Sequence, residues 1–491
     1  MRAYHHWIGG KDAVGHGPDR VTRSSPAHGA LLASYAAGTA EDVDRAAQTA
    51  AAAQVGWAAM TGMERAGRIT ALADLILRDR ERLAVIEAEE AGKTIRDARG
   101  ELSHSANLAR YAAALAWEIP GRAQSHHGDS ALGLVTYEPR GVVGMITPWN
   151  FPAVTLFQKL PYALAAGNAV VIKPSELTSG TTLEIARLAA EAGIPDGVIN
   201  VVTGKGTVVG TAMIEHPLVD MISFTGSTRA GTEIGAACAR QVKRAGLELG
   251  GKAANVVFAD ADLDDALDGA LFGTILNAGQ ECVAGTRILV ERRIAKDFTE
   301  ALVERAAKLR VGMPLDETAD IASVIHEAHM TSVLGHIETA RKEGARIAAG
   351  GHRKLDGDFG KGYFVQPSIL ADVTPSMTYF REEVFGPVAS ITVFDTIEEA
   401  VALANDTTYG LGNGLWTKDV DKALQLSKRL KSGTVWVNTY LDGAPQMPFG
   451  GYKRSGLGRE NGIEGLIEFM DVKSTFIRLG KRTKALGHTA A

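Results

Sequence analysis

Cysteine, long apolar runs and clusters of basic residues are all scarce in this chain of 491 residues. Its two cysteines, Cys238 and Cys282, exclude a disulfide framework, which fits a reducing compartment. No stretch approaches the ~18 uncharged apolar residues that span a bilayer, and the N-terminal residues lack the apolar segment of a signal peptide. We therefore expect a cytoplasmic protein with no membrane partner.

The charge balance argues against a further class of partner. With 52 Lys and Arg against 57 Asp and Glu, the formal net charge is −5, and no segment is rich in Lys or Arg. Nucleic acid is therefore not expected to bind, and small molecules are the default ligands. The 13 histidines are scattered without the spacing of metal ligands, so no metal site is predicted.

The remaining composition, 45% apolar and 22% charged, is that of a globular protein with about three domain-sized parts. Residues 1–120 are expected to be mainly helical, because Thr39–Asp42 has a capping-box pattern that opens an Ala-rich segment to about Met60. From Gly141 onward, short β-branched runs alternate with segments of helical length, which predicts a doubly wound parallel sheet. The expected strands are 142–146, 169–172, 198–202, 221–224 and 255–258, and the expected helices 181–192 and 229–239.

The alternation begins again after Ala259 and predicts a second α/β domain that reaches about Phe449. Two β-like excursions, Gly121–Pro139 and Lys473–Leu479, could pair into an arm whose edges need a partner subunit. Residues 481–491 are polar and small, and we expect them to fray.

Several residues in this frame could carry chemistry. Cys282 stands among glycines and small residues after a predicted helix, whereas Cys238 lies in an Ala-rich helix and is expected to be a packing residue. Glu248, between leucines at the end of a predicted strand, would gain a raised pKa on burial and suit a general base. Asn150 is pinned by two prolines and could face an oxyanion. Taken singly, a structural cysteine, a solvated carboxylate and a helix-capping Asn remain open for these three positions.

Two further strand ends have features of a dinucleotide site. Lys173 and Glu176 could hold the hydroxyls of an adenosine ribose, and the carboxylate would repel a 2′-phosphate. The segment Phe224–Thr228 ends a strand and opens a helix, where free N–H groups meet phosphates. The pattern Gly204–Gly210 is one residue too long for the dinucleotide fingerprint and is not interpreted as one. Ordinary helix N-termini would explain the other two segments equally well.

In combination and in this order, the motifs resemble the aldehyde dehydrogenase superfamily over nearly the whole chain, from Trp7 to the strand after Lys473. Seven motifs carry the resemblance: Pro148–Pro152, Lys173–Glu176, Phe224–Ser227, Leu247–Lys252, Gly279–Cys282, Glu382–Pro387, and Pro448–Lys453 with Ser455–Glu460.

The resemblance implies an α/β fold of the aldehyde dehydrogenase type, with two doubly wound domains and a β oligomerisation arm. A dinucleotide-binding domain would comprise residues 1–120 and 140–250, and a catalytic domain residues 251–455. The arm and C-terminal segment would comprise 121–139 and 456–491. Such an arm implies a homodimer or homotetramer.

The resemblance also implies a mechanism. Cys282 would attack an aldehyde to give a thiohemiacetal, with the oxyanion held by Asn150, and then a thioester. Glu248 would activate the hydrolytic water, and Lys159 and Glu460 match a proton relay. Relatives that pass the acyl group to coenzyme A lack this glutamate, so hydrolysis is implied. NAD is the implied cofactor, with NADP disfavoured. The implied cofactor residues are Ile146, Thr147, Pro148, Trp149, Lys173, Ser175, Glu176, Gly206, Phe224, Gly226, Ser227, Leu249, Glu383 and Phe385.

The substrate pocket departs from the common pattern. Glu281 stands where many relatives have a neutral residue, and if it faces the pocket it would favour cationic aldehydes. Gln158 and Gly443 replace frequent aromatics and predict a wider, more polar entrance. The implied pocket residues are Phe151, Gln158, Glu281, Val283, Gly443 and Phe449. An aminoaldehyde or semialdehyde substrate, a catalytically silent structural relative and a cysteine hydrolase without nicotinamide are the alternatives.

Overall fold

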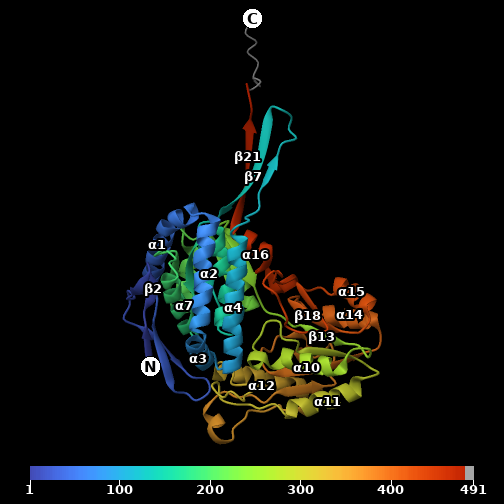
Figure 1. Ribbon diagram of the computed structural model, residues 1–491. Helices are drawn as coiled ribbons and strands as arrows, with labels where there is room; N and C mark the ends of the chain where they lie inside the picture. Colours follow the sequence, from blue (N-terminus) through green and yellow to red (C-terminus); the bar gives the residue numbers. More distant parts are fainter. Residues whose placement is uncertain (482–491) are drawn as a thin grey trace.

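Two α/β units lie side by side, and a β arm projects from the first of them (Figure 1). The computed structural model describes residues 1–481. The first α/β unit is built on an eight-stranded sheet and the second on a seven-stranded sheet. Within the described residues, no helix is long and apolar enough to cross a membrane.

The sheet of the first unit has five parallel strands at its centre and antiparallel strands at its edges. Its order is β20 (Gly456–Leu457), β12 (Arg244–Glu248), β11 (Met221–Thr225), β8 (Val142–Ile146), β9 (Ala169–Lys173), β10 (Ile199–Val201), β2 (His6–Ile8) and β3 (Lys11–Ala13). The expected strands near 142, 169, 198 and 221 are confirmed. The chain leaves β8 toward β9 and β10, then returns to β11 on the other side. This reversal creates a crevice at the carboxyl ends of β8 and β11, where such sheets bind ligands.

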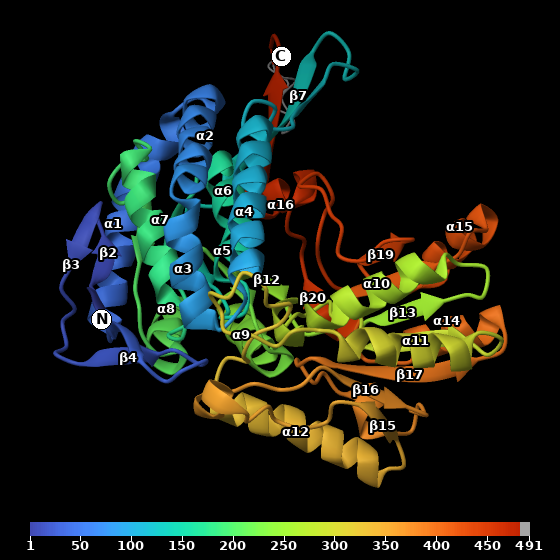
Figure 2. The same cartoon turned by 60° about the horizontal axis from the view of Figure 1, so that its bottom comes forward.

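Helices cover both faces of this sheet because its strands are apolar on both sides. Val142 and Ile146 pack into one core, and Val143 and Met145 pack into the other. On the first face lie α1 (Ala40–Ala59), α8 (Thr211–Glu215) and α9 (Thr228–Arg240). On the second lie α2 (Gly62–Arg78), α3 (Arg80–Ala91), α4 (Ile95–Leu115), α5 (Pro152–Phe157), α6 (Leu160–Ala166), α7 (Ser179–Glu191) and α16 (Gly462–Glu468) (Figure 2). The capping box at Thr39 and the helices expected at 181–192 and 229–239 are confirmed.

The second unit repeats the parallel arrangement, which confirms the expected second α/β domain. Its strand order is β15 (Arg346–Ala349), β16 (Ser368–Ala371), β17 (Val388–Phe394), β14 (Arg287–Glu291), β13 (Ala254–Val257), β18 (Gly412–Trp416) and β19 (Thr434–Val437). Only β15 is antiparallel to its neighbour. The helices are α10 (Leu263–Ile275), α11 (Ala295–Ala307), α12 (Glu327–Lys342), α13 (Thr378–Arg381), α14 (Ile397–Asn405) and α15 (Val420–Arg429). Short helical turns are η1 (Gly206–Gly210), η2 (Leu276–Gly279), η3 (Gly357–Lys361) and η4 (Lys453–Ser455).

The expectation that residues 1–120 are mainly helical is wrong for their first third. Five short strands precede α1: β2 and β3 extend the first sheet, while β1 (Arg2–Tyr4), β5 (Leu31–Ala36) and β4 (Arg20–Ser24) form a separate sheet. These strands are three to six residues long, and β2 pairs with β10, nearly 200 residues further along. Strands this short have a weak periodic signal, and the distant partner is supplied by the tertiary fold.

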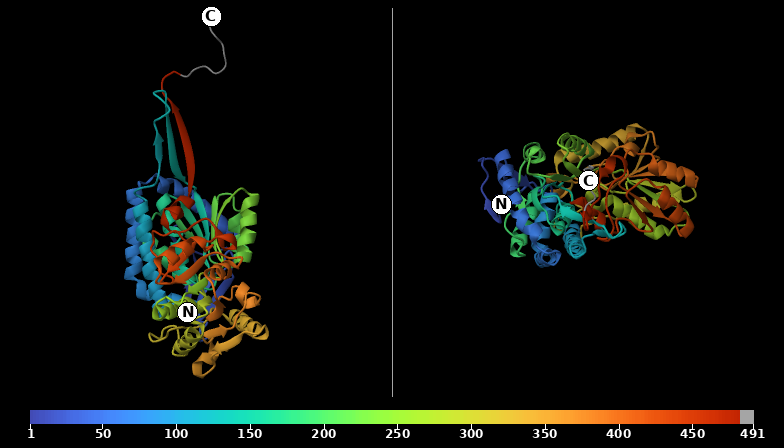
Figure 3. Two further views of the ribbon diagram at one scale, coloured as in Figure 1. Left: turned by 90° about the vertical axis from the view of Figure 1, so that its right-hand side faces the viewer. Right: turned by 90° about the horizontal axis from the view of Figure 1, so that it is seen from above.

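The arm is a three-stranded antiparallel sheet, as the two excursions predict. Its strands are β6 (Arg122–Gln124), β7 (Ala131–Pro139) and β21 (Met470–Arg478). Figure 3 shows it extending well beyond the helices of the first unit. Val472 and Phe476 on β21 are largely exposed. Residues 482–491 of the segment that we expect to fray lie outside the described residues.

Candidate active site

The residues that the sequence singles out in the first unit gather at one edge of its sheet. Ile146–Asn150 follows β8, Lys173–Glu176 follows β9, Gly226 follows β11, and Glu248 ends β12. Since these parallel strands are neighbours, their carboxyl ends open into the same crevice. A backbone hydrogen bond joins two of these strand ends, since Gly226 N–H donates to the carbonyl of Glu248 at 3.0 Å.

Cys282 is presented by a strained loop that enters β14 of the second unit. Asn277, Ala278 and Gly279 have positive φ values of 49°, 55° and 70° in succession. Left-handed backbone is unfavourable for residues with a side chain, and such strain collects at functional sites. A Cβ at Gly279 would lie 2.2 Å from the carbonyl oxygen of Gly386, so this loop packs directly on the segment before β17.

The amide of Asn150 joins this loop to the first unit. Asn150 is buried, and its Nδ2 donates to the carbonyl of Gln280 at 2.9 Å. In return, Nδ2 of Asn277 donates to the carbonyl of Asn150 at 2.7 Å. Asn150 does not cap the following helix, since the N-cap of α5 is Phe151. One N–H of the Asn150 amide therefore fixes its orientation and the second is available for a ligand.

The thiol of Cys282 lies among several acidic side chains. The side chain is partly exposed, and burial raises the pKa of the thiol well above its usual value, with further increases from Glu281, Glu383 and Glu248. A Cβ at Gly251 would lie 2.1 Å from the carbonyl oxygen of Cys282, so the segment after β12 touches the loop that carries Cys282. The thiol needs a base, because it is protonated at neutral pH in this environment.

Glu248 has the properties of such a base. It is 4% exposed, and neither carboxylate oxygen has a hydrogen-bond partner in the part of the chain that the structure describes. Burial raises its pKa well above the usual value, the charge of Glu460 raises it further, and the Lys159 ammonium opposes both. The sequence expectation of a raised pKa is confirmed. A carboxyl group whose pKa is raised holds a proton more readily than an ordinary glutamate, which suits a group that accepts one.

Lys159 and Glu460 form a buried ion pair beside Glu248. The Nζ of Lys159 contacts both Glu460 and the hydroxyl of Thr225 at the end of β11. Glu460 is placed by its backbone, which exchanges two hydrogen bonds of 2.7 Å with Phe449. Both members of this pair act on Glu248 through their charge, with no direct hydrogen bond to it among residues 1–481.

The features expected of a dinucleotide site also lie together. Nζ of Lys173 is 3.2 Å from Glu176, and a Cβ at Gly206 would lie 4.0 Å from the same Nζ. The hydroxyl of Thr147 is buried and lacks a hydrogen-bond partner among residues 1–481. Thr147 N–H donates to the carbonyl of Lys173 at 3.1 Å, so the free hydroxyl and the buried cation belong to neighbouring strand ends. Together with the side-chain-free position at Gly206, they fit a polar ligand of the predicted kind.

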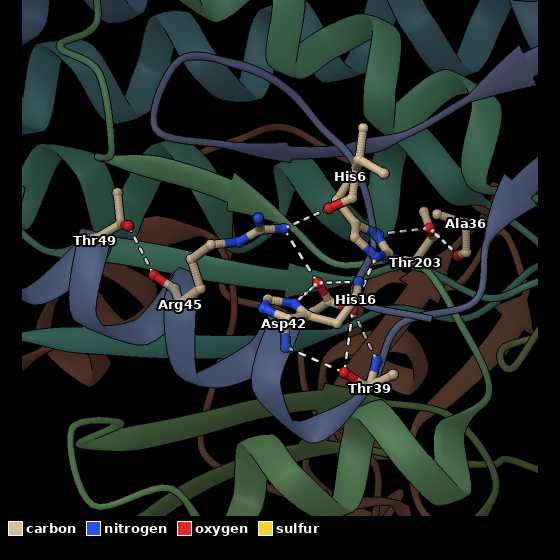
Figure 4. Close-up of polar contacts among 9 residues, drawn as sticks. His6, His16, Ala36, Thr39, Asp42, Arg45, Thr49 and Thr203 are labelled. Carbon is tan, nitrogen blue, oxygen red and sulfur yellow. Dashed lines mark hydrogen bonds and ion pairs between the residues drawn. The ribbon is translucent and has the colours of Figure 1, made fainter. Parts of the chain in front are cut away.

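A buried network fixes the loop that leads to Gly206. Thr203 N–H donates to Nδ1 of His6 at 3.2 Å, and the Thr203 hydroxyl donates to the carbonyl of Ala36 at 2.7 Å (Figure 4). Nε2 of His6 faces Asp42 at 3.4 Å. The capping residues of α1 thus hold the residues that precede η1.

The remaining predicted cofactor residues surround these groups. Ser227 caps α9 by accepting a hydrogen bond from Ala230 N–H at 3.3 Å, and Leu249 packs so closely on Gly231 that a Cβ there would lie 2.2 Å from it. Pro148 belongs to the loop after β8, while Ser175 accepts a hydrogen bond from Leu177 N–H. The helix terminus at Ser227 is open to phosphate oxygens.

Glu383 and Phe385 approach from the second unit. Oε1 of Glu383 accepts a hydrogen bond of 3.0 Å from Gly251 N–H, and burial raises the pKa of this carboxyl to about 7. The Phe385 ring lies edge-to-face with Trp149, with ring centroids 5.4 Å apart. These two contacts tie the segment before β17 to the ends of β12 and β8.

The predicted pocket residues are not all in one environment. Phe151 covers the buried ammonium of Lys93 at 4.4 Å, and Gln158 ends α5 and is partly exposed. Gly443 is exposed with open space around it. Val283, by contrast, packs within a hydrophobic core of the second unit. Phe449 is partly buried beside that same core.

Glu281 has an acidic neighbour and a basic one. Burial and the charge of Asp97 raise its pKa to about 8, and the Lys93 ammonium opposes the rise. Lys93 is itself paired with Glu101, whose other oxygen accepts hydrogen bonds from two backbone N–H groups that begin α5. The Oε2 of Glu281 is buried without a hydrogen-bond partner in residues 1–481.

Several residues that matter to this arrangement were not assigned roles from the sequence. Asn277 and Gln280 fix Asn150 and the nucleophile loop, and Lys93 with Glu101 supports Phe151 and α5. Asn277 and Gln280 both shortly precede Cys282 in the sequence, so their polarity was a usable signal. Lys93 lies between α3 and α4 and Glu101 lies on α4, both far from Phe151 in the chain, and no local pattern marks them. Cys238 is fully buried in a core, as expected.

The chain matches known proteins along most of its length. The model of the family described as "Aldehyde dehydrogenase family" matches residues 14–475. A crystal structure of an NAD-dependent aldehyde dehydrogenase from Sinorhizobium meliloti is 44% identical with a TM-score of 0.97, over 99% of this chain and 96% of that one. An NAD+ complex of an aldehyde dehydrogenase from Bacillus cereus is 39% identical with a TM-score of 0.95, over 98% and 97%.

A third structure is a point mutant of betaine aldehyde dehydrogenase from Staphylococcus aureus, in complex with NAD+ and with a BME-modified cysteine. It is 36% identical with a TM-score of 0.96, over 98% of this chain and 99% of that one. The match of the family model to residues 14–475, together with these identities, shows that the chain belongs to the aldehyde dehydrogenase family.

Proposed function

We propose that this protein oxidises an aldehyde to a carboxylic acid with NAD, through a covalent intermediate on Cys282 that is hydrolysed with Glu248 as general base. The observation that carries the proposal is the bond from the Asn150 amide to Gln280. It fixes a side-chain donor of the first unit against the loop that presents the only partly exposed thiol among the described residues. Nucleophile and oxyanion donor are thus brought to the same place.

Covalent chemistry begins at the thiol. Glu248 accepts the proton of Cys282. The sulfur then adds to the aldehyde carbon, and the π-electron pair of the carbonyl bond moves to the oxygen. The free N–H of Asn150 and the backbone N–H of Cys282 donate to this oxyanion. Collapse of the oxyanion expels a hydride from the carbon and leaves a thioester. NAD, when bound, supplies the acceptor for that hydride.

Hydrolysis completes the cycle. After Glu248 has passed the thiol proton on toward Glu460, it takes a proton from water, the water oxygen adds to the thioester carbon, and the carbon–sulfur bond breaks to release the acid and restore the thiolate. Lys159 and Glu460 stabilise the charge that moves through Glu248 and pass its proton inward. Family members that transfer the acyl group to coenzyme A lack a glutamate at this position, and its presence here favours water as the acceptor.

The cofactor would lie along the crevice of the first unit. Lys173 and Glu176 would hold the adenosine ribose, and the backbone at Gly226 and Ser227 the pyrophosphate. Glu383 and Phe385 would hold the nicotinamide ribose and ring. The carboxylate of Glu176 would repel a 2′-phosphate, which favours NAD over NADP. The S. meliloti and B. cereus relatives, described as NAD-dependent and solved with NAD+, support this choice.

For the substrate, an aldehyde that carries a cation is the second candidate. Glu281 immediately precedes Cys282, and one of its carboxyl oxygens, Oε2, has no hydrogen-bond partner among residues 1–481. The S. aureus relative is a betaine aldehyde dehydrogenase. Once Glu281 is ionised, above a pH of about 8, it would repel a semialdehyde with an acidic tail. The presence of Cys282, Glu248 and Asn150 argues against a catalytically silent relative, and the Lys173–Glu176 pair would have no role in a simple hydrolase.

The units and the arm also receive roles in this proposal. The first unit binds the dinucleotide, and the second carries the nucleophile. The exposed apolar side chains of β21 are covered by another subunit, in a homodimer or homotetramer. Two free thiols and the acidic net charge suit the cytoplasm.

A panel of aldehydes tests the proposal, with NADH appearance at 340 nm as an ordinary readout of this chemistry. The wild type should reduce NAD with at least one neutral or cationic aldehyde. Cys282→Ala should abolish turnover and still bind NAD in calorimetry. Cys238→Ala, which removes the other thiol, serves as the matched control and should retain turnover. Full activity of the Cys282 variant, or no turnover with any aldehyde, would contradict the mechanism.

A further inference from the structure

The segment Ile325–His329 leads into α12. It contacts the loop before Cys282 and the segment before β17, which are the two loops of the second unit that reach the site. Ile325 N–H donates to Oε1 of Gln280 at 2.9 Å, and its carbonyl accepts a hydrogen bond from the buried guanidinium of Arg23 at 3.2 Å. This segment is therefore anchored to the nucleophile loop on one side and to the N-terminal residues on the other. Figure 2 shows α12 at the bottom of the second unit.

One helical turn further on, His329 reaches the second loop. Its Nε2 lies 2.7 Å from the carbonyl oxygen of Phe385. A carbonyl can only accept, so Nε2 carries the proton and donates. Burial lowers the pKa of His329 to about 4, so the ring is neutral at pH 7 and keeps this tautomer. The bond is therefore present throughout the pH range in which the enzyme would work.

The residue that receives this bond is conformationally strained. Phe385 has a φ of 58°, which is unfavourable for an aromatic side chain. Such a conformation persists only where its surroundings hold it. His329 is the side chain that fixes the Phe385 carbonyl.

The ring of His329 also contacts the first unit. It lies edge-to-face with Trp149, with centroids 5.6 Å apart, and Trp149 in turn contacts Phe385 at 5.4 Å. Three rings from the loop after β8, from α12 and from the segment before β17 thus form one cluster. The cluster connects the two units at the end of the crevice where Glu383 lies.

We infer that His329 is a positioning residue that holds Phe385 and Trp149 in the arrangement needed by the nicotinamide end of the cofactor. The inference rests on the proposed function, which makes Glu383 and Phe385 contacts of that end. His329 acts through Phe385 and takes no part in bond making. Loss of the His329 side chain therefore releases the segment that carries Glu383 and Phe385. The loop that carries Cys282 stays in place, because Ile325 separately bonds to Gln280.

Three substitutions separate the hydrogen bond from the packing. His329→Ala removes both, His329→Phe keeps a ring against Trp149 but no donor, and His329→Gln keeps an amide N–H donor of similar reach. The NAD dissociation constant, measured by calorimetry without any aldehyde, should rise about threefold to tenfold for Ala and Phe, the range for one hydrogen bond to a neutral acceptor. Gln should recover most of the affinity. kcat should fall in the same order, while KM for the aldehyde changes little.

The rate of Cys282 alkylation by iodoacetamide in the absence of NAD reports the nucleophile loop, and we expect all three variants to stay within about twofold of wild type, well below the effect of a lost catalytic contact. His352→Ala, at an exposed position in the same unit, is the control for removing a histidine. An NAD affinity of His329→Ala equal to wild type would overturn the inference while leaving the proposed function intact. Equal loss of NAD affinity and of alkylation rate would show a general structural role and overturn it too. Failure of wild type to bind NAD would instead refute the proposed function, and this inference with it.

Discussion

Replacing Glu248 by Gln should separate the two halves of the reaction. Gln has the same shape but cannot accept a proton, so hydrolysis of the thioester loses its base. General bases contribute roughly 10²- to 10⁴-fold, which corresponds to about 2.7–5.5 kcal/mol of transition-state stabilisation. When another base, such as water, removes the thiol proton, the first turnover can still occur. NADH should then appear as a burst of about one per subunit, followed by a steady rate that is roughly 10²- to 10⁴-fold lower than in the wild type.

The structure also sets the pH dependence. The ionised form of Glu248 is the base, and burial together with Glu460 raises its pKa. In wild type the hydrolytic rate should therefore rise with pH up to that raised pKa and then level off. Glu460→Gln removes the like charge and leaves the Lys159 ammonium unpaired, and both effects lower the pKa of Glu248. We expect the rise to move to lower pH by about one pH unit, equivalent to about 1.4 kcal/mol.

Rapid-mixing absorbance at several pH values measures both effects. A Glu248→Gln variant whose steady rate equals that of the wild type would show that Glu248 does not act in hydrolysis. A profile of Glu460→Gln displaced to higher pH would refute the electrostatic reasoning. Circular dichroism melts of each variant would confirm that the fold is retained.

Four further outcomes follow from the contacts described. Glu281→Gln should reduce kcat/KM for cationic aldehydes more than for neutral ones, and the wild-type preference should grow as pH rises through about 8, where Glu281 ionises; equal effects on both aldehyde classes would contradict this. Glu176→Gln should improve NADP relative to NAD by at least about tenfold, as expected when a like charge near the 2′-phosphate is removed; an unchanged cofactor ratio would refute the repulsion. Gly279→Ala should lower kcat and the melting temperature, because its Cβ would meet the Gly386 carbonyl at 2.2 Å and its backbone is left-handed at a cost of about 1–2 kcal/mol; wild-type kinetics would show that the loop relaxes freely. Phe476→Asp on the arm should reduce the particle mass in light scattering, and an unchanged mass would place the subunit contact elsewhere.

The sequence anticipated the parts of the fold that have a local signal. Buried parallel strands such as β8 and β9 are continuous apolar runs, and capping residues such as Thr39 mark helix starts. The strands before α1 were missed, since each has only a few residues and β2 depends on β10 for its pairing. Short strands are determined by their partners more than by their own residues.

For the candidate site, the motifs named the nucleophile, the base and the oxyanion donor by residue type and by resemblance. The contacts that hold them were not readable from spacing. Asn277 reaches Asn150, Lys93 supports Phe151, and His329 binds the Phe385 carbonyl, in each case across more than 50 residues of chain.

By itself, the sequence determined the fold class, the family and the chemical groups available, because these depend on local periodicity and on motifs contiguous in the chain. Only the tertiary structure decided that Val283 packs into a core, that Glu281 shares its surroundings with Asp97 and Lys93, and that Glu248 is raised in pKa by Glu460. Burial and charge coupling are properties of groups brought together by packing, and residues distant in the chain acquire them only in the folded protein.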